Sequence, residues 1–299
     1  MSMHPHVMQR RAFPADGSTS AILDCRMNQA TATDLITSRR NPLVGRCRTL
    51  ARPGSDASGD MLLDGVHVVD EAIRTGLPIE VVALDIETIE NRGLLQPWVE
   101  RLAGCGATVV RVTSAVMAAM SPSADASGVV AIARRPALRL PGWLEWAPRT
   151  VLVASDVQDP GNVGALVRVA HAVGFDGLVA TGTTADPWAW KALRGSMGSA
   201  FHVPVVVERD TVRVLDALRT HGLRLVATVP RGGQSVDTAD LAPPLALLIG
   251  GEGAGLTNRM LEMADERISL AMVDTVESLN VAVAAGILAY EVRRRGSVL

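Results

Sequence analysis

The chain has 299 residues, of which 48% are hydrophobic and 20% charged, and its formal net charge at pH 7 is −2. This length suffices for two domains. No apolar run reaches the roughly 18 residues of a membrane span and no signal-peptide pattern opens the chain, so we expect a cytoplasmic protein. Three widely spaced cysteines (Cys25, Cys47 and Cys105) and six scattered histidines form no ligand pair, which disfavours a disulfide framework and predicts no metal site.

The first half of the chain predicts an extension followed by a small α/β domain. Residues 1–30 mix polar residues, proline and methionine without apolar periodicity, which indicates a flexible extension. Between residues 31 and 135, short apolar runs alternate with amphipathic segments. This pattern predicts strands at 61–63, 79–84, 107–112 and 128–133, and helices at 66–74 and 94–102.

A basic cluster lies near the start of this first domain. No acidic residue interrupts its five arginines, which are Arg39, Arg40, Arg46, Arg48 and Arg52. A solvated surface accounts for such a cluster, but the planar guanidinium group also suits phosphate. Phosphate binding therefore remains open at this point.

A linker and a larger α/β domain complete the chain. Residues 136–148 contain Pro141-Gly142 and two tryptophans, Trp143 and Trp146, and break the alternation; we expect the tryptophans to anchor this linker by packing. Residues 149–299 predict a doubly wound, mostly parallel sheet. Its expected strands lie at 151–154, 177–180, 203–207, 223–227, 245–249 and 268–272, and its expected helices at 162–173, 187–196, 211–220, 256–263 and 278–294.

Three loop-to-helix segments carry the chemistry of this second domain. They are residues 159–168 (DPGNVGALVR), 248–256 (LIGGEGAGL) and 277–286 (ESLNVAVAAG). Each follows a short apolar run that predicts a buried strand. The carboxyl ends of parallel strands meet at one edge of a sheet, which is where α/β proteins bind ligands. We therefore expect the three loops to form one site.

The first of these segments contains two polar candidates. Asn162 is placed to cap the following helix and Gly174 to end it, which is a purely structural explanation. Arg168 shares a helix face with Gly164 and Gly161, so we expect nothing bulky beside it to block a ligand. A snorkelling or ion-paired arginine is the alternative.

The glycine-rich second segment matches neither a phosphate loop, which ends in GK followed by S or T, nor the GxGxxG dinucleotide fingerprint. Its glycines permit close approach to a ligand around Glu252, although a tight turn with a helix-capping glutamate fits equally well. Ser278 and Asn280 open a helix of small residues, which favours core packing or a subunit contact. Ser196 lacks the first glycine of a GxSxG elbow, because Arg194 occupies that place, so we expect no nucleophilic serine.

Together, the three segments resemble the three motifs of the SpoU-type RNA ribose 2′-O-methyltransferases, within the SPOUT superfamily. The stretch Arg194-Gly195-Ser196-Met197-Gly198 resembles the segment that this family carries between its first two motifs. Ser38-Arg39-Arg40-Asn41-Pro42, followed by Leu62-Leu63-Asp64-Gly65, resembles the ribosomal-protein-like RNA-binding domain of many members.

The resemblance implies a C-terminal α/β domain with a deep trefoil knot, a homodimer formed through that domain, and transfer of a methyl group from S-adenosylmethionine to a ribose 2′-hydroxyl. It assigns Asn162 and Arg168 to the reacting centre. The implied cofactor residues are Thr181, Gly182, Ile249, Gly250, Gly251, Glu252, Leu270, Met272, Ser278, Leu279 and Asn280. The implied RNA-binding residues are Arg39, Arg40, Asn41, Arg46, Arg48 and Arg52.

Two positions depart from the family pattern: Ala271 stands where proline is usual, and Asp64 where glutamate is usual. Ribosomal RNA is the expected substrate, because the extra N-terminal domain is commoner in relatives that act on it. Transfer RNA is the first alternative. The second is an RNA-binding or ribosome assembly factor without activity, which Ala271 makes conceivable. A nucleotide-dependent dehydrogenase, suggested only by glycine content, ranks below both.

Overall fold

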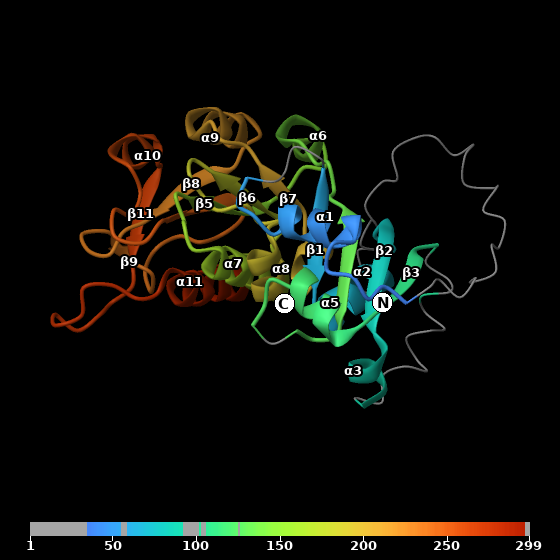
Figure 1. Ribbon diagram of the computed structural model, residues 1–299. Helices are drawn as coiled ribbons and strands as arrows, with labels where there is room; N and C mark the ends of the chain where they lie inside the picture. The colour runs from blue at the N-terminus through green and yellow to red at the C-terminus, as the bar shows by residue number, and fades with distance from the viewer. Residues whose placement is uncertain (1–34, 55–58, 92–101, 103–105, 125, 297–299) are drawn as a thin grey trace, which may run out of the picture. The chain divides into compact units, whose positions relative to one another are not determined.

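The computed structural model describes residues 35–54, 59–91, 102, 106–124 and 126–296. In these residues the strands form two sheets, one of four strands before residue 135 and one of seven strands after residue 149 (Figure 1). The predicted extension 1–30, nearly all of the predicted helix 94–102, Cys25 and Cys105 lie outside the described residues. The predicted domain boundaries remain predictions.

The four-stranded sheet has the order β1-β4-β2-β3. Strand β4 pairs antiparallel with β1 and β2, whereas β2 and β3 are parallel. The predicted strand positions are confirmed to within one residue. The bounds are β1 (Asp60–Asp64), β2 (Ile79–Asp85), β3 (Thr108–Val112) and β4 (Val129–Arg134).

Helices cover both faces of this sheet. Met61 and Leu63 share a core with the predicted helix, α2 (Val66–Arg74), whereas Leu62 packs with α1 (Pro42–Leu50) and α5 (Ser114–Met120). The alternation follows from the period of two along a strand. The sequence analysis did not identify α1, α5 or α3 (Ile86–Asn91), because short helices carry too few apolar positions for a clear period.

The seven-stranded sheet is entirely parallel and has the order β7-β6-β5-β10-β8-β11-β9. The predicted parallel sheet is therefore confirmed. The bounds are β5 (Thr150–Ser155), β6 (Gly177–Thr181), β7 (Val205–Val207), β8 (Arg224–Thr228), β9 (Gln234–Ser235), β10 (Leu245–Gly250) and β11 (Glu266–Ser269).

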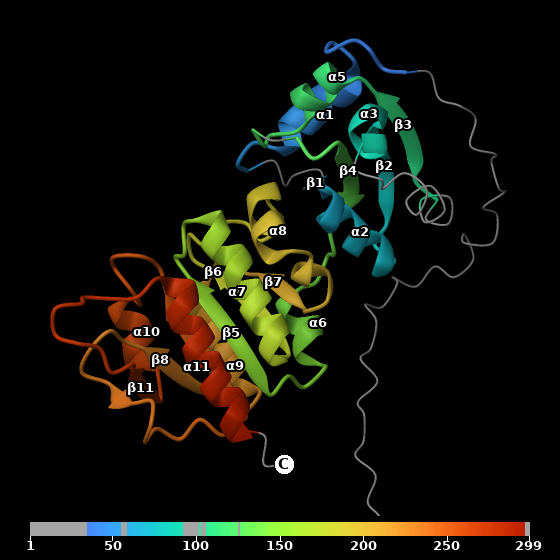
Figure 2. The same ribbon diagram turned by 90° about the horizontal axis from the view of Figure 1, so that it is seen from below.

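This sheet is doubly wound, as Figures 1 and 2 show. Val151 and Val153 of β5 share a core with the helices of one face, and Leu152 and Ala154 with those of the other. On the first face lie α6 (Leu140–Leu144), α9 (Thr211–Thr220) and α10 (Asn258–Met263). On the second lie α7 (Pro160–Val173), α8 (Trp190–Ser196) and α11 (Val281–Gly296), with the short 3₁₀ helix η2 (Ser199–Phe201).

The predicted linker contains a helix, α6, that the sequence analysis did not anticipate. Trp143 on α6 is buried, and a Cβ atom added to Gly177 of β6 would lie 2.4 Å from its Cζ2 atom. The predicted anchoring role of Trp143 is therefore confirmed. Trp146, with 40% of its surface exposed, does not share it.

The predicted strand 268–272 is displaced: β11 (Glu266–Ser269) begins two residues earlier and ends three residues earlier. Strand β11 pairs with β9 only at Ile268 and Ser269, because β9 itself has two residues. The chain then runs as an irregular loop from 270 to 280, and α11 begins at Val281 instead of Ser278.

Candidate active site

The three motif loops leave one edge of the parallel sheet. Ser155 at the end of β5 is level with Thr181 on β6 and with Gly250 on β10, so these strands end side by side. The loops after β5 and β10 carry the first two motifs. A hydrogen bond between Asn280 and Asn162 connects the third motif to the first. The expectation that the three loops meet at one edge of the sheet is therefore confirmed.

The first motif begins α7 in a way that differs from the prediction. Asp159, not Asn162, is the N-cap residue, and its carboxylate accepts a hydrogen bond from the backbone N–H of Asn162 at 2.9 Å. A carboxylate is an equally good cap, so the Asn162 side chain is not needed for that purpose. Gly174, at φ 77°, ends the helix as predicted.

Asn162 links the three motifs by side-chain hydrogen bonds. Its Nδ2 atom donates to Oε1 of Glu252 at 2.6 Å, and its Oδ1 atom accepts from Nδ2 of Asn280 at 3.1 Å. Asn280 in turn caps α11, because its Oδ1 atom accepts from the N–H groups of Ala282 and Val283. One polar residue from each motif is thus part of a single hydrogen-bonded chain of side chains, which runs from Glu252 through Asn162 to Asn280.

Glu252 lies in the glycine-rich turn after β10 and does not cap a helix. The following helix, α10, is capped by Thr257. The second oxygen of Glu252, Oε2, is 3.4 Å from the backbone nitrogen of Gln158, so the carboxylate reaches across to the loop after β5. The helix-capping alternative for Glu252 is therefore wrong.

The glycines of this turn are required by close packing. A Cβ atom on Gly250 would lie 2.3 Å from the carbonyl carbon of Gly255, and one on Gly251 would lie 2.0 Å from the backbone oxygen of Asp156. Real side chains do not tolerate such contacts. The turn therefore folds back on itself and lies against the end of β5 only because both positions are glycine.

Asp156, which the sequence analysis missed, follows β5 directly. Its carboxylate accepts hydrogen bonds from the N–H and hydroxyl groups of Thr183 and from the hydroxyl of Ser155. Burial opposes the charge of this carboxylate, but these bonds outweigh it, so the pKa of Asp156 lies below its usual value. Its place at the carboxyl end of a predicted strand was the available signal.

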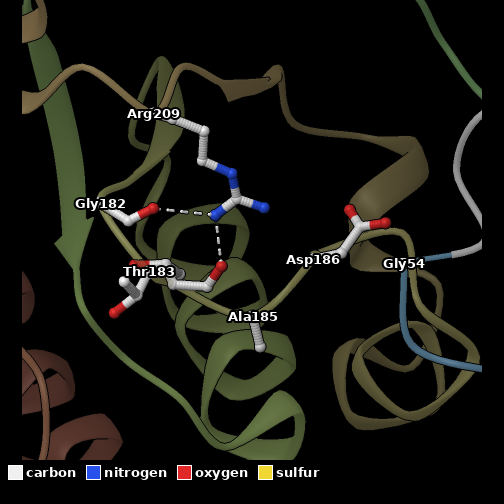
Figure 3. A pocket seen from close by; sticks show the side chains of 7 residues that line it. Gly54, Gly182, Thr183, Ala185, Asp186 and Arg209 are labelled. Carbon is white, nitrogen blue, oxygen red and sulfur yellow. Dashed lines mark hydrogen bonds between the residues drawn. The ribbon is translucent and has the colours of Figure 1, made fainter.

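Of the predicted cofactor residues, Thr181 ends β6 and Gly182 begins the loop after it. Thr181 is buried, and its hydroxyl lies 3.0 Å from that of Thr211. Figure 3 shows the guanidinium group of Arg209, also missed in the sequence analysis, donating to the carbonyl oxygen of Gly182. The same group donates to the carbonyl oxygen of Thr184. Side chains from outside the motifs thus hold this loop.

The third-motif loop presents free backbone. Leu270 and Met272 are half-buried, whereas Ser278 and Leu279 are exposed. Within the described residues, the N–H group of Val276 is the only one between 270 and 280 that donates to another protein atom. The other N–H groups of this loop have no acceptor in the described part of the chain, whereas the carbonyl groups of Asp274 and Val276 accept from Arg231.

Arg168 stands apart from the hydrogen-bonded chain. It is exposed, and it makes no hydrogen bond or ion pair with the part of the chain that the structure describes. Six residues separate it from Asn162, which places the two side chains about 120° apart around α7. The structure therefore does not bring the two predicted reacting-centre residues together.

The open surface expected at Gly164, beside Arg168, is absent. Helix α8 covers Gly164, and an added Cβ atom would lie 2.2 Å from the carbonyl oxygen of Ala192. This expectation was wrong because the glycine serves helix packing instead of ligand access. Ser196 on α8 is buried and donates to the carbonyl of Leu193, as expected of a serine that is not a nucleophile.

The predicted RNA-binding residues divide into two groups. Hydrogen bonds to Glu80 and then Asp60 raise the pKa of Arg46 and occupy its guanidinium, so we remove Arg46 from the proposed phosphate contacts. Asn41 caps α1. Arg40 and Arg52 are exposed, and Arg39 and Arg48 each donate one bond to a backbone carbonyl. RNA binding by these residues remains a prediction.

Other sequence-based expectations concern cysteine, metal and membrane. Burial raises the pKa of the Cys47 thiol to about 12, as expected of an unreactive cysteine. Among the described residues, no three His, Cys, Asp or Glu side chains are grouped to hold a metal ion. No helix in the described ranges is long and apolar enough to cross a bilayer.

Comparison with known proteins identifies the family. Residues 149–290 match the SpoU rRNA methylase family. RlmP of Bacillus subtilis, a 23S rRNA (guanosine(2553)-2′-O)-methyltransferase, is 31% identical to the chain over 78% of its length and 88% of that protein. The chain belongs to the SpoU rRNA methylase family. An uncharacterised tRNA/rRNA methyltransferase of Synechocystis is 33% identical over 87% of the chain and 93% of that relative.

Solved structures of methyltransferases share the fold. The AdoMet-bound rRNA methyltransferase of Sinorhizobium meliloti is 27% identical, with a TM-score of 0.76 over 90% of this chain and all of that one. The SpoU methyltransferase AviRb of Streptomyces viridochromogenes, also in complex with AdoMet, is 28% identical, with a TM-score of 0.75 over 85% and 97%. The family inferred from the three motifs is confirmed.

Proposed function

We propose that the protein uses S-adenosylmethionine to methylate a ribose 2′-hydroxyl in ribosomal RNA, in the cytoplasm. The observation that carries this proposal is the hydrogen-bonded chain of Glu252, Asn162 and Asn280, which unites the three motifs at one sheet edge. The ribose position and the RNA class are supported by the similarity to RlmP of Bacillus subtilis.

The three loops fit the cofactor. Gly182 lies at the end of β6, and Gly250 and Gly251 lie at the end of β10, on the two sides of β5; the loop 270–280 offers unused N–H groups beside the half-buried Leu270 and Met272. An adenosine moiety requires such a combination of backbone hydrogen bonds and apolar contacts. We assign Thr181, Ile249, Ser278 and Leu279 to the same pocket, and Glu252 and Asn280 to shaping it.

When bound, S-adenosylmethionine supplies a methyl group on a positively charged sulfur. The chain would then have to align the ribose oxygen with that methyl carbon, so that the oxygen–carbon bond forms as the sulfur–carbon bond breaks and leaves a neutral thioether, and to favour loss of the hydroxyl proton to solvent. An arginine guanidinium stays protonated at neutral pH and is a poor base. We assign Arg168 to holding the neighbouring phosphate and stabilising the negative charge that develops on the ribose oxygen. We assign Asn162 to orienting the groups around that oxygen.

We infer further that the seven-stranded domain carries the trefoil knot of its family and pairs with a second copy. Helix α11 leaves Val283, Ile287 and Tyr290 exposed, by 52%, 44% and 59%. Their spacing of four and three residues forms one apolar stripe, which water disfavours on a monomer. A homodimer through α11 would bury it.

The proposed RNA contacts lie on the first domain, at Arg39, Arg40, Arg48 and Arg52. Cationic contacts with phosphate release counterions, so the affinity for RNA should fall steeply between 50 and 200 mM salt. Filter binding with an unmodified ribosomal RNA fragment measures this slope. An affinity that does not change with salt would contradict a phosphate-binding role for these arginines.

Transfer of labelled methyl from S-adenosylmethionine to unmodified ribosomal RNA, and separately to unmodified transfer RNA, tests the function. Digestion to nucleosides identifies the product. We expect a 2′-O-methyl nucleoside from ribosomal RNA. A product from transfer RNA alone would move the substrate to that class, and cofactor binding without any product would indicate an assembling ribosomal particle as substrate. A protein that binds no cofactor would be an RNA-binding or assembly factor.

A further inference from the structure

Asp156 occupies the centre of the candidate site without a part in the reaction proposed above. It follows β5, which lies between β6 and β10 in the sheet. The loops after those two neighbours carry Gly182 and Gly251, both assigned to the cofactor pocket. A residue at the end of the middle strand is therefore within reach of both loops.

The side chain of Asp156 holds the loop after β6. Its Oδ1 atom accepts from the backbone nitrogen of Thr183 at 2.8 Å and from the Thr183 hydroxyl at 2.9 Å. A Cβ atom on Gly182 would lie 2.4 Å from the same oxygen. The Oδ2 atom accepts from the hydroxyl of Ser155 at 2.8 Å, which fixes the orientation of the carboxylate.

The backbone of Asp156 meets the loop after β10. Its carbonyl oxygen would lie 2.0 Å from a Cβ atom on Gly251, so the two main chains touch. Asp156 has φ 59° at this contact, in the left-handed region that non-glycine residues other than Asn and Asp rarely adopt.

We propose that Asp156 is a positioning residue that clamps the loops after β6 and β10 together and so presets the cofactor pocket. The inference rests on the proposed function. A preset pocket binds its ligand more tightly, because the ordering of the loops is not paid for on binding. Charged hydrogen bonds are the stronger ones, and the clamp uses three of them.

Three substitutions of Asp156 distinguish the effect of its carboxylate from the effect of its backbone conformation. Asp156→Ala removes both the hydrogen bonds and the tolerance of positive φ. Asp156→Gly accepts the backbone but removes the bonds. Asp156→Asn keeps an acceptor for Thr183 and tolerates the positive φ. Its amide nitrogen can donate to the Ser155 hydroxyl in place of the lost acceptor. We expect the dissociation constant for S-adenosylmethionine to rise about tenfold in the Ala and Gly variants and about threefold or less in the Asn variant.

A matched control lies at the opposite edge of the same strands. The carboxylate of Asp176 also accepts three hydrogen bonds, from the backbone nitrogens of Arg149 and Thr150 and from the Thr150 hydroxyl. Asp176→Ala removes as many bonds as Asp156→Ala, but at the amino ends of β5 and β6. We expect it to lower the thermal stability without changing the affinity for the cofactor.

Three measurements on the folded chain test whether Asp156 presets the pocket: titration calorimetry with S-adenosylmethionine, steady-state methyl transfer and amide hydrogen exchange. We expect Asp156→Ala to raise the KM for the cofactor, to leave the KM for RNA and kcat within about twofold, and to speed exchange of the Thr183 amide. Unchanged cofactor affinity in the Ala and Gly variants, or an equal loss in Asp176→Ala, would overturn the clamp. A wild-type chain that binds no cofactor would overturn the proposed function as well.

Discussion

At the scale of single residues, Arg168 is the clearest candidate for a role confined to the transition state. It is exposed on α7 and makes no hydrogen bond or ion pair within the described residues. Its removal should leave the loops that hold the cofactor intact. We predict that Arg168→Ala lowers kcat roughly 100-fold and leaves the dissociation constant for S-adenosylmethionine unchanged. Single-turnover methyl transfer and calorimetry measure the two quantities.

Arg213→Ala is the matched control for this prediction. Arg213 lies on α9, on the other face of the sheet, with 60% of its side chain exposed. Its loss removes the same charge without touching the motif loops, so kcat should be retained. An undiminished turnover number in Arg168→Ala would refute the assigned role.

Substitution of Glu252 should weaken cofactor binding, in contrast to substitution of Arg168, which should lower turnover. Glu252→Ala leaves the amide of Asn162 without its acceptor and removes the contact to Gln158, so the turn after β10 loses its link to the first motif. We predict a cofactor dissociation constant about tenfold higher, with partial retention in Glu252→Gln, which keeps one acceptor. Calorimetry with S-adenosylmethionine measures both. Normal binding by Glu252→Ala would contradict the assignment.

The residues of the site that the sequence predicted share one property: each stands in a motif with a recognisable local spacing. Asn162, Glu252 and Asn280 could be selected in this way, and the structure joins them. Arg209 could not, and Asp156 offered only its place at the end of a predicted strand, because the partners of both are loops that lie near them only after the sheet has formed. Which glycine serves a ligand and which a neighbouring helix was equally hidden, as Gly164 demonstrates.

At the scale of elements, the contact between α7 and α8 depends on Gly164. An added Cβ atom would meet only backbone atoms: the oxygen of Ala192 at 2.2 Å, the nitrogen of Ser196 at 2.8 Å and the carbonyl carbon of Gly195 at 3.0 Å. Backbone cannot move aside as a side chain can. We predict that Gly164→Ala destabilises the protein by about 2 kcal/mol, measured by chemical denaturation.

Gly45→Ala supplies the control, because Gly45 also lies inside a helix but has nothing within 4 Å of an added Cβ atom. Alanine is the better helix former, so this variant should be stabilised by up to about 1 kcal/mol. Equal effects of the two substitutions would show that helix propensity, and not the packing of α7 on α8, decides the outcome.

The elements that the sequence predicted well are those with strong apolar patterns. Strands β5, β6 and β10 are continuous apolar runs, and they were found because both of their faces are buried. The end of β11 was misplaced, because Leu270 and Met272 continue the apolar pattern after the pairing partner β9 has ended. Pairing is a property of two segments, and one segment does not reveal it.

At the scale of the whole molecule, the exposed stripe of α11 predicts a dimer that depends on apolar contact. We predict that Ile287→Asp converts the protein to a monomer, because the interface would have to bury an unpaired charge. Sedimentation equilibrium measures the mass. Val212→Asp, at an exposed valine of α9, is the control and should leave the mass unchanged. A dimeric Ile287→Asp protein would place the interface elsewhere.

The strand order of the seven-stranded sheet has a consequence for folding during synthesis on the ribosome. Thr150 at the start of β5 pairs with Leu245 at the start of β10, so one side of β5 has no partner until β10 has been made. Until then, the nascent chain offers an unpaired apolar edge to other chains. Such long-range pairing is slow to form. The unpaired side of β5 therefore stays uncovered while the chain from Ser155 to Leu245 is made, a consequence of the strand order alone.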